Sequence, residues 1–146
     1  MKYESDNIIN IINKINDAFK QTLLSLYPYP YEGNTDVYSY YLTGHCPSYA
    51  QILYNIFNDT QTINFYTIED SRRGVHIVTK IGEHFYDVRG VVDSIIILST
   101  INKFDYSYMG AIQDYYGNND SIDCMLITKL SEIGQKQKVK KRFPTS

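Results

Sequence analysis

A cysteine, a histidine and an aspartate follow one another in this chain in an order that can assemble a thiol nucleophile. Cys46 lies in the segment TGHCPSYA, residues 43–50, directly ahead of a short helical pattern, and His76 and Asp87 follow in a predicted hairpin. A thiol becomes a good nucleophile near neutral pH when a helix N-terminus and a nearby imidazolium favour the thiolate. We therefore expect Cys46 to attack an acyl carbon, His76 to move the proton and Asp87 to fix the imidazole tautomer.

The predicted hairpin gives this hypothesis a geometric basis. Residues 75–81 and 84–88 have strand patterns that flank a two-residue turn, Gly82-Glu83. With this turn His76 and Asp87 share one face of the sheet as diagonal neighbours, roughly 7–8 Å apart at the backbone. A three-residue turn would move Asp87 to the other face. His84 falls on the face opposite His76, so it is left out of the site.

The segment around Cys46 predicts the start of a helix. Proline is favoured at the first helical position, so Pro47 predicts a helix over residues 47–57 with Cys46 at or beside its N-cap. The Cys46 backbone N–H would then be able to bind an oxyanion, and each such donor typically contributes ~3 kcal/mol of transition-state stabilisation. We expect a second donor from the tyrosine-rich segment that precedes Cys46, although the sequence does not single out a residue.

The remaining elements predict an α+β fold with the cysteine-bearing helix packed on an antiparallel sheet. Isoleucines, a phenylalanine and a leucine recur every three or four residues between Ile8 and Leu23, which indicates an amphipathic helix that ends before Pro28. The other predictions are a surface loop over residues 28–43, a strand over 62–67, a short buried helix or strand over 91–98, a tyrosine-rich loop with a short helix over 105–117, and a final strand over 124–129.

Size and charge limit the function further. The chain has 146 residues, enough for one domain with a hydrophobic core, which we place at residues 1–135. Five of the 14 Lys and Arg residues lie in residues 136–146, predicted as a flexible basic tail, whereas all 16 acidic residues precede them. The rest of the chain therefore carries about −7, which argues against nucleic acid as the partner.

The cysteine content and hydropathy point to a reducing compartment. Two cysteines, Cys46 and Cys124, do not form a disulfide framework, and Cys124 lies in an apolar run typical of a core. No apolar run approaches the ~20 residues that cross a bilayer, and the N-terminus lacks a signal-peptide core. We expect a cytoplasmic protein that has no membrane partner and needs no cofactor or metal.

The segments around these three residues resemble the core of the papain-like and transglutaminase-like cysteine enzymes. The resemblance covers about residues 43–90: a Gly-x-Cys at a helix start, a His opening a strand (VHIV, 75–78) and an Asp in the next strand (GEHFYDV, 82–88). It implies a nucleophile at Cys46, a base at His76 and an orienting acid at Asp87. The activity implied is that of a peptidase, deamidase, amidase, transglutaminase or acyltransferase, with a peptide, protein or small amide as substrate.

The sequence departs from that family in two places and leaves other interpretations open. The interval between the Cys and the His is short, and Pro47 stands where many members have a bulky aromatic residue. Cys46 can instead be a buried, inert side chain, His76 an edge histidine, and Asp87 the structural partner of Arg89. The chain can also be a non-catalytic binding or accessory protein of phage or mobile-element origin. A zinc module is a third possibility, with ligands from His45, Cys46, His76, His84 and Asp87.

Overall fold

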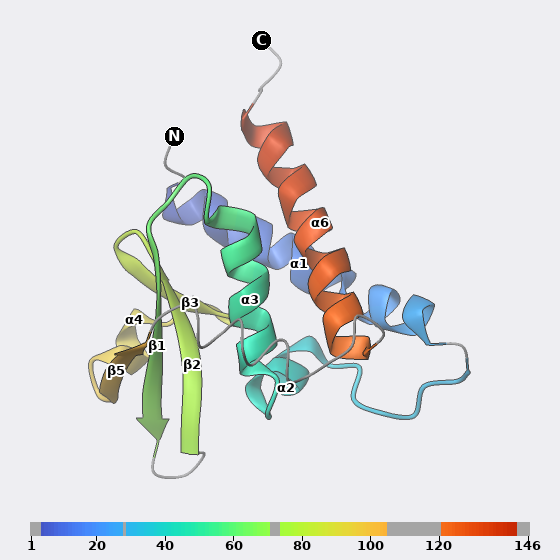
Figure 1. Cartoon of the computed structure of the whole chain (residues 1–146), viewed down its shortest axis with the longest axis horizontal. Coiled ribbons are helices and arrows are strands. Elements are labelled where there is room, and N and C mark those ends of the chain that lie inside the picture. The colour runs from blue at the N-terminus through green and yellow to red at the C-terminus, as the bar shows by residue number, and fades with distance from the viewer. Residues whose placement is uncertain (1–3, 28, 71–73, 105–120, 143–146) are drawn as a thin grey trace.

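The computed structural model describes residues 4–27, 29–70, 74–104 and 121–142. Within them the elements run α1 (Ser5–Leu26), α2 (Val37–Leu42), α3 (Cys46–Phe57), β1 (Ile63–Asp70), β2 (Gly74–Ile81), β3 (His84–Asp87), β4 (Gly90–Val91), α4 (Asp93–Ile96), β5 (Thr100–Phe104) and α6 (Ile122–Arg142) (Figure 1). The fold is α+β, as the sequence predicts. The tyrosine-rich segment 105–117 lies outside the described residues.

The strands form one antiparallel sheet in the order β4-β3-β2-β1-β5. Ile81 is paired with His84, and Gly82 between them has a φ of +63°, a left-handed conformation that favours glycine. The predicted two-residue turn is thereby confirmed. β1 and β5 extend the sheet on the other side of β2, and the sequence analysis assigned no strand to the segment that forms β5.

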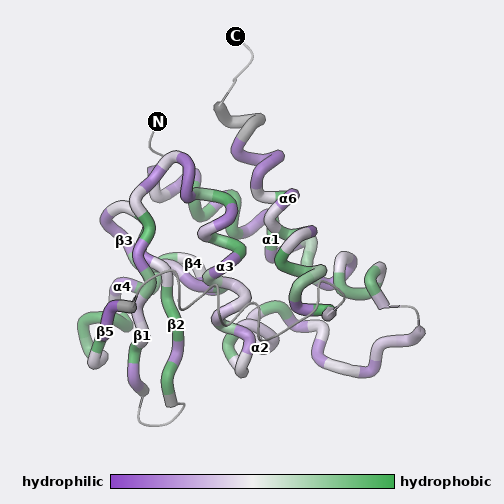
Figure 2. Tube along the Cα trace, viewed as in Figure 1, coloured by the Kyte–Doolittle hydropathy of each residue, from purple (hydrophilic) through white to green (hydrophobic). Residues whose placement is uncertain are grey.

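The long helices α1, α3 and α6 lie on one side of this sheet, whereas Ile95 and Ile96 of α4 pack with Ile68 and Val78 of the sheet (Figure 1). α3 packs against β1, β2 and β3, and α1 contacts the other end of the sheet at β4 (Figure 1). α6 packs against both α3 and α1. α1 alternates hydrophilic and hydrophobic residues, as an amphipathic helix does, and the C-terminal half of α6 is mainly hydrophilic (Figure 2). The main core lies where these helices meet, and its fully buried members include Ile8, Ile11, Ile12, Ile15, Phe19, Leu23, Ile52, Leu53, Ile56, Phe57 and Leu126.

The structure corrects the predicted final strand. Residues 124–129 belong to α6, not to a strand. The apolar run is short enough to suit either structure, but the buried positions Cys124, Ile127 and Leu130 recur at helical spacing and continue to Ser131 and Lys138. One face of the long helix α6 is therefore buried in the segment for which a strand was predicted.

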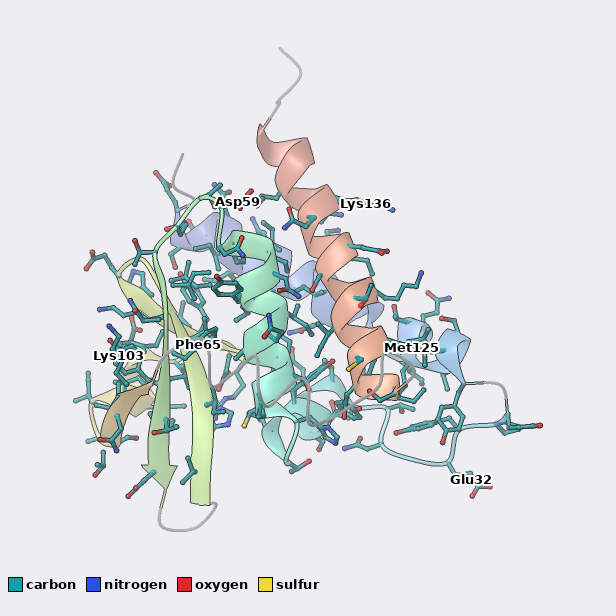
Figure 3. The ribbon with its side chains drawn as sticks, in the orientation of Figure 1. Glu32, Asp59, Phe65, Lys103, Met125 and Lys136 are labelled. Atoms are coloured by element: carbon teal, nitrogen blue, oxygen red, sulfur yellow. The ribbon has the colours of Figure 1, made fainter. Side chains whose placement is uncertain are left out.

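The predicted flexible tail also needs correction, because the proposed boundary after residue 135 falls inside α6. Lys138 is only 3% exposed. Its ammonium donates to the Ile56 carbonyl at 2.5 Å and pairs with Asp59, which lies just beyond the C-terminal end of α3 (Figure 3). A cation at the C-terminus of a helix is stabilising, and this contact holds the basic segment against α3.

Two connecting segments also differ from prediction. The expected surface loop before Cys46 contains α2, whose Tyr38 N–H donates to the Asp36 carboxylate, and Tyr41 in this helix is buried. Residues 91–98 include the helix α4, yet Ile97 and Leu98 are 82% and 90% exposed, so the apolar run there is not a buried element. None of the helices in the described part of the chain combines the length and apolar character that crossing a bilayer requires.

Candidate active site

Cys46 is the first residue of α3, one position earlier than the sequence predicted. Gly44, two residues before it, has a φ of +93°, so the chain enters the helix through a conformation that side chains disfavour. Pro47 follows within the first turn. The thiol side chain is half-buried and contacts the cluster of Ala50, Phe65 and Ile77 between α3 and the sheet. Since the first N–H groups of a helix have no intrahelical partner, the Cys46 N–H is available to an anion.

His76 and Asp87 meet as the hairpin register predicts. The Nε2 atom of His76 lies 2.9 Å from Oδ2 of Asp87 and donates its proton to it. The His76 side chain is 14% exposed and that of Asp87 is 4% exposed. The shared-face prediction for these two residues is confirmed, because the pairing of Thr79 with Tyr86 and of Ile81 with His84 sets the required parity.

Asp87 has a second partner at the same time. The Arg89 guanidinium donates to the carboxylate at 2.6 Å through Nη2 and at 3.2 Å through Nε, and the Arg89 backbone N–H donates at 2.8 Å. Burial alone would raise the pKa of Asp87, but these bonds and the one from His76 hold it below its ordinary value. The carboxylate is thus a fixed negative charge, and the pairing with Arg89 accompanies the histidine contact rather than replacing it.

His76 is held in its charged form by this environment. Burial lowers the pKa of His76, but hydrogen bonds and electrostatic interactions with Asp87 and Cys46 outweigh burial and raise the pKa to about 9. Because Asp87 occupies Nε2, Nδ1 is the ring nitrogen left to exchange a proton with the Cys46 sulfur. The arrangement favours an imidazolium that faces a thiol at a helix start.

Cys46, His76 and Asp87 line a common gap between α3 and the sheet. Tyr41, Tyr49 and Tyr86 are among the other lining residues, and the gap has no room for a water molecule in this structure. The three residues named from the sequence are therefore brought together around a narrow gap.

A second histidine–carboxylate contact adjoins Cys46, and the sequence analysis did not find it. His45 Nδ1 lies 3.1 Å from Oδ1 of Asp123 in α6, and the imidazole stacks on Tyr40 with ring centres 4.2 Å apart. Tyr40 donates its hydroxyl to the same carboxylate at 2.6 Å. Asp123 is 78 residues from His45, so no local pattern could have indicated this contact. It fastens the N-terminal end of α3 to α6.

A buried amide supports the other side of the site. Asn16 of α1 is 9% exposed. It accepts a hydrogen bond from the Tyr49 hydroxyl at 2.8 Å and donates to the Val88 carbonyl at 2.8 Å. Val88 directly follows Asp87, so α1 holds the end of β3 in place. In the sequence, the only sign of this role is that Asn16 is a polar residue within the apolar face of α1.

The three histidines lie in separate pairs. His45 contacts Asp123, His76 contacts Asp87, and His84 contacts Asp93 at 2.6 Å in a largely exposed pair on α4 and β3. Within residues 4–27, 29–70, 74–104 and 121–142, no three His, Cys, Asp or Glu residues are grouped so as to hold a metal ion. Cys124 is buried in α6 and is not among the residues that line the gap.

Comparison with known proteins adds one finding. Searches of curated proteins and of solved structures found no match to the chain. A family model described as phage YunG-like protein matches residues 11–123, a span that contains Cys46, His76, Asp87 and Asp123. This match covers most of the chain, and the chain therefore belongs to the phage YunG-like protein family.

Proposed function

We propose that this protein is a thiol-dependent hydrolase or acyltransferase that acts on an amide through Cys46, His76 and Asp87. The observation that carries the proposal is a buried imidazole that is hydrogen-bonded through Nε2 to a carboxylate and interacts with a cysteine at the start of a helix. The resemblance of residues 43–90 to papain-like and transglutaminase-like enzymes supports the same roles. The substrate class is a peptide, a protein or a small amide.

The proposed reaction assigns each residue a separate step. The Cys46 thiolate forms a C–S bond to the amide carbon while the carbonyl electron pair moves to oxygen. The oxyanion accepts a hydrogen bond from the Cys46 N–H. The tetrahedral intermediate then expels the amine, which takes the Nδ1 proton of His76, and a thioester remains. Water or an acceptor amine attacks the thioester while neutral His76 removes its proton, and Cys46 is released.

Asp87 acts on His76 rather than on the substrate. Its hydrogen bond to Nε2 leaves Nδ1 directed at the sulfur and stabilises the imidazolium. The carboxylate itself keeps its charge throughout, because Arg89 and His76 hold its pKa low. Hydrolysis, deamidation and transfer share all of these steps and differ only in the nucleophile that resolves the thioester.

One observation favours a different function. The gap beside Cys46 is closed to water in this structure, as expected of a protein that keeps the fold without turnover. A non-catalytic binding or accessory protein of phage origin is therefore the second candidate, and the name of the family agrees with a phage origin. The two candidates differ in whether Cys46 is chemically activated.

Alkylation of the folded protein by iodoacetamide, followed by mass spectrometry of each cysteine, separates these functions. The enzyme proposal expects Cys46 to react at least tenfold faster than Cys124 at pH 7.5. It also expects His76→Ala to remove this advantage and Cys124→Ser to leave it unchanged. Equal, slow labelling of both cysteines, or labelling of Cys46 that does not depend on His76, would contradict the enzyme proposal and favour the accessory protein.

A further inference from the structure

The Tyr41 hydroxyl, which belongs to the lining of the gap beside Cys46, is buried and has no partner among the described residues. Three tyrosines line this gap. The Tyr49 hydroxyl donates to Asn16 at 2.8 Å, and the Tyr86 hydroxyl donates to Ser5 at 3.1 Å. The Tyr41 hydroxyl is fully buried, and among the residues that the structure describes it has no hydrogen-bond partner. Buried polar groups are rarely left unpaired, so such a group in a candidate site calls for a functional explanation.

Tyr41 is also rigidly placed. The residue is 1% exposed. Its ring packs edge-on against Phe19, Tyr40 and Tyr49, with ring centres 5.4, 5.0 and 4.9 Å away. Burial raises the pKa of Tyr41 well above its ordinary value, so the hydroxyl stays protonated and remains a donor at every pH near neutrality. Because the gap admits no water, this donor is not spent on solvent.

The position of Tyr41 suits the donor that the thiol chemistry still lacks. An oxyanion is usually bound by two donors, and the Cys46 N–H supplies one. Tyr41 lies in α2, the helix just before Cys46, and lines the same gap as the thiol and His76. The other nearby candidate, Tyr40, already donates its hydroxyl to Asp123. We propose that the Tyr41 hydroxyl is the second oxyanion donor of the site and hence a catalytic residue.

This inference rests on the proposed function and adds a role within its first step. When the Cys46 sulfur bonds to the acyl carbon, the carbonyl electron pair moves to oxygen, and that oxygen enters the gap and accepts the Tyr41 O–H. The tyrosine keeps its proton, so no charge is transferred to it. When the leaving group departs, the electron pair returns to re-form the carbonyl and the hydrogen bond weakens. An acyl group must open the gap slightly to reach the hydroxyl.

A comparison of two reactions at the same sulfur tests the role of Tyr41. Acetylation by p-nitrophenyl acetate passes through an oxyanion, whereas alkylation by iodoacetamide does not. In Tyr41→Phe we expect acetylation of Cys46 to slow by at least tenfold, because loss of one oxyanion donor typically costs ~10²–10³-fold in rate. Alkylation should keep its wild-type rate, and the midpoint of thermal unfolding should stay the same or rise, because an unpaired hydroxyl has been removed.

Tyr49→Phe is the matched control, since it removes a paired hydroxyl that lines the same gap. This variant should unfold at a lower temperature and keep the wild-type ratio of acetylation to alkylation. Three outcomes overturn the role of Tyr41 alone: unchanged acetylation in Tyr41→Phe, an equal loss of both reactions, or a marked fall in its unfolding temperature. If His76→Ala alters neither reaction in an otherwise wild-type chain, the proposed function itself fails, and the role of Tyr41 fails with it.

Discussion

Replacing Asp87 with Asn should lower the pKa of His76 by a measurable amount, and the size of this decrease can be worked out from the contacts of His76. The rise of the His76 pKa from 6.5 to about 9 corresponds to about 3 kcal/mol in favour of the imidazolium, at ~1.4 kcal/mol per pH unit. Burial opposes this rise, so the interactions of His76 with Asp87 and Cys46 must supply all of it and more. If Asp87 supplies half, its loss lowers the pKa by at least about one unit.

The Asn variant keeps the shape of the side chain and removes its charge. Arg89 then loses its carboxylate partner, and its positive charge near His76 disfavours the imidazolium further. We therefore expect the His76 titration midpoint to fall from near 9 in the wild type to 8 or below in Asp87→Asn. At pH 8.5 most wild-type His76 side chains should carry a proton, whereas most of those in the variant should not.

Titration of the imidazole C–H signals by two-dimensional NMR measures this directly and requires no substrate. His76→Gln assigns the signal, and Asp93→Asn is the matched control, because it removes the carboxylate partner of His84 instead. The control should leave the His76 midpoint at its wild-type value. A wild-type midpoint near 6.5, or an Asp87→Asn midpoint equal to the wild type, would refute the electrostatic argument for the site.

Three further predictions concern stability. Because the folded protein binds the His76 proton more tightly than the unfolded chain, the free energy of unfolding should fall by up to about 3 kcal/mol from pH 6.5 through pH 9, and urea titrations of His76→Gln should lack this fall. Lys138→Met removes the buried cation at the end of α3 and should cost ~1–2 kcal/mol, whereas exposed Lys136→Met should change stability by less than ~0.5 kcal/mol. Asn16→Ala leaves the Tyr49 hydroxyl and the Val88 carbonyl unpaired, so it should lower the free energy of unfolding by about 2 kcal/mol or more. The matched control Asn13→Ala, at an exposed position, should change it little. Equal effects of the two lysine variants, or of the two asparagine variants, would contradict these assignments.

The parts of the site that depend on local pattern were predictable from the sequence. A two-residue turn fixes side-chain parity along both of its strands, so the contact of His76 with Asp87 followed from the position of Gly82 alone. Pro47 marked the start of α3 to within one residue. The isoleucine spacing likewise predicted α1, because a long amphipathic stripe is the strongest single signal of a helix.

The parts that depend on distant contacts were not predictable. The short apolar run at residues 124–129 suits a strand as well as a helix, and only its packing on α1 and α3 decides for α6. The basic residues after 135 were predicted to be a solvent-exposed tail, because nothing nearby in the sequence shows that Lys138 contacts the C-terminal end of α3. The pairing of His45 with Asp123 and the unpaired hydroxyl of Tyr41 exist only in three dimensions.

α6 contacts α3 at both ends, because Asp123 pairs with His45 at the N-terminus of α3 and Lys138 pairs with Asp59 just beyond its C-terminus. During synthesis α3 is made well before Asp123 and Lys138 of α6. A nascent chain thus carries the sulfur, the imidazole and the carboxylate while α3 still lacks both anchors. The two ends of α3 are therefore fixed against α6 only after the final helix has been made.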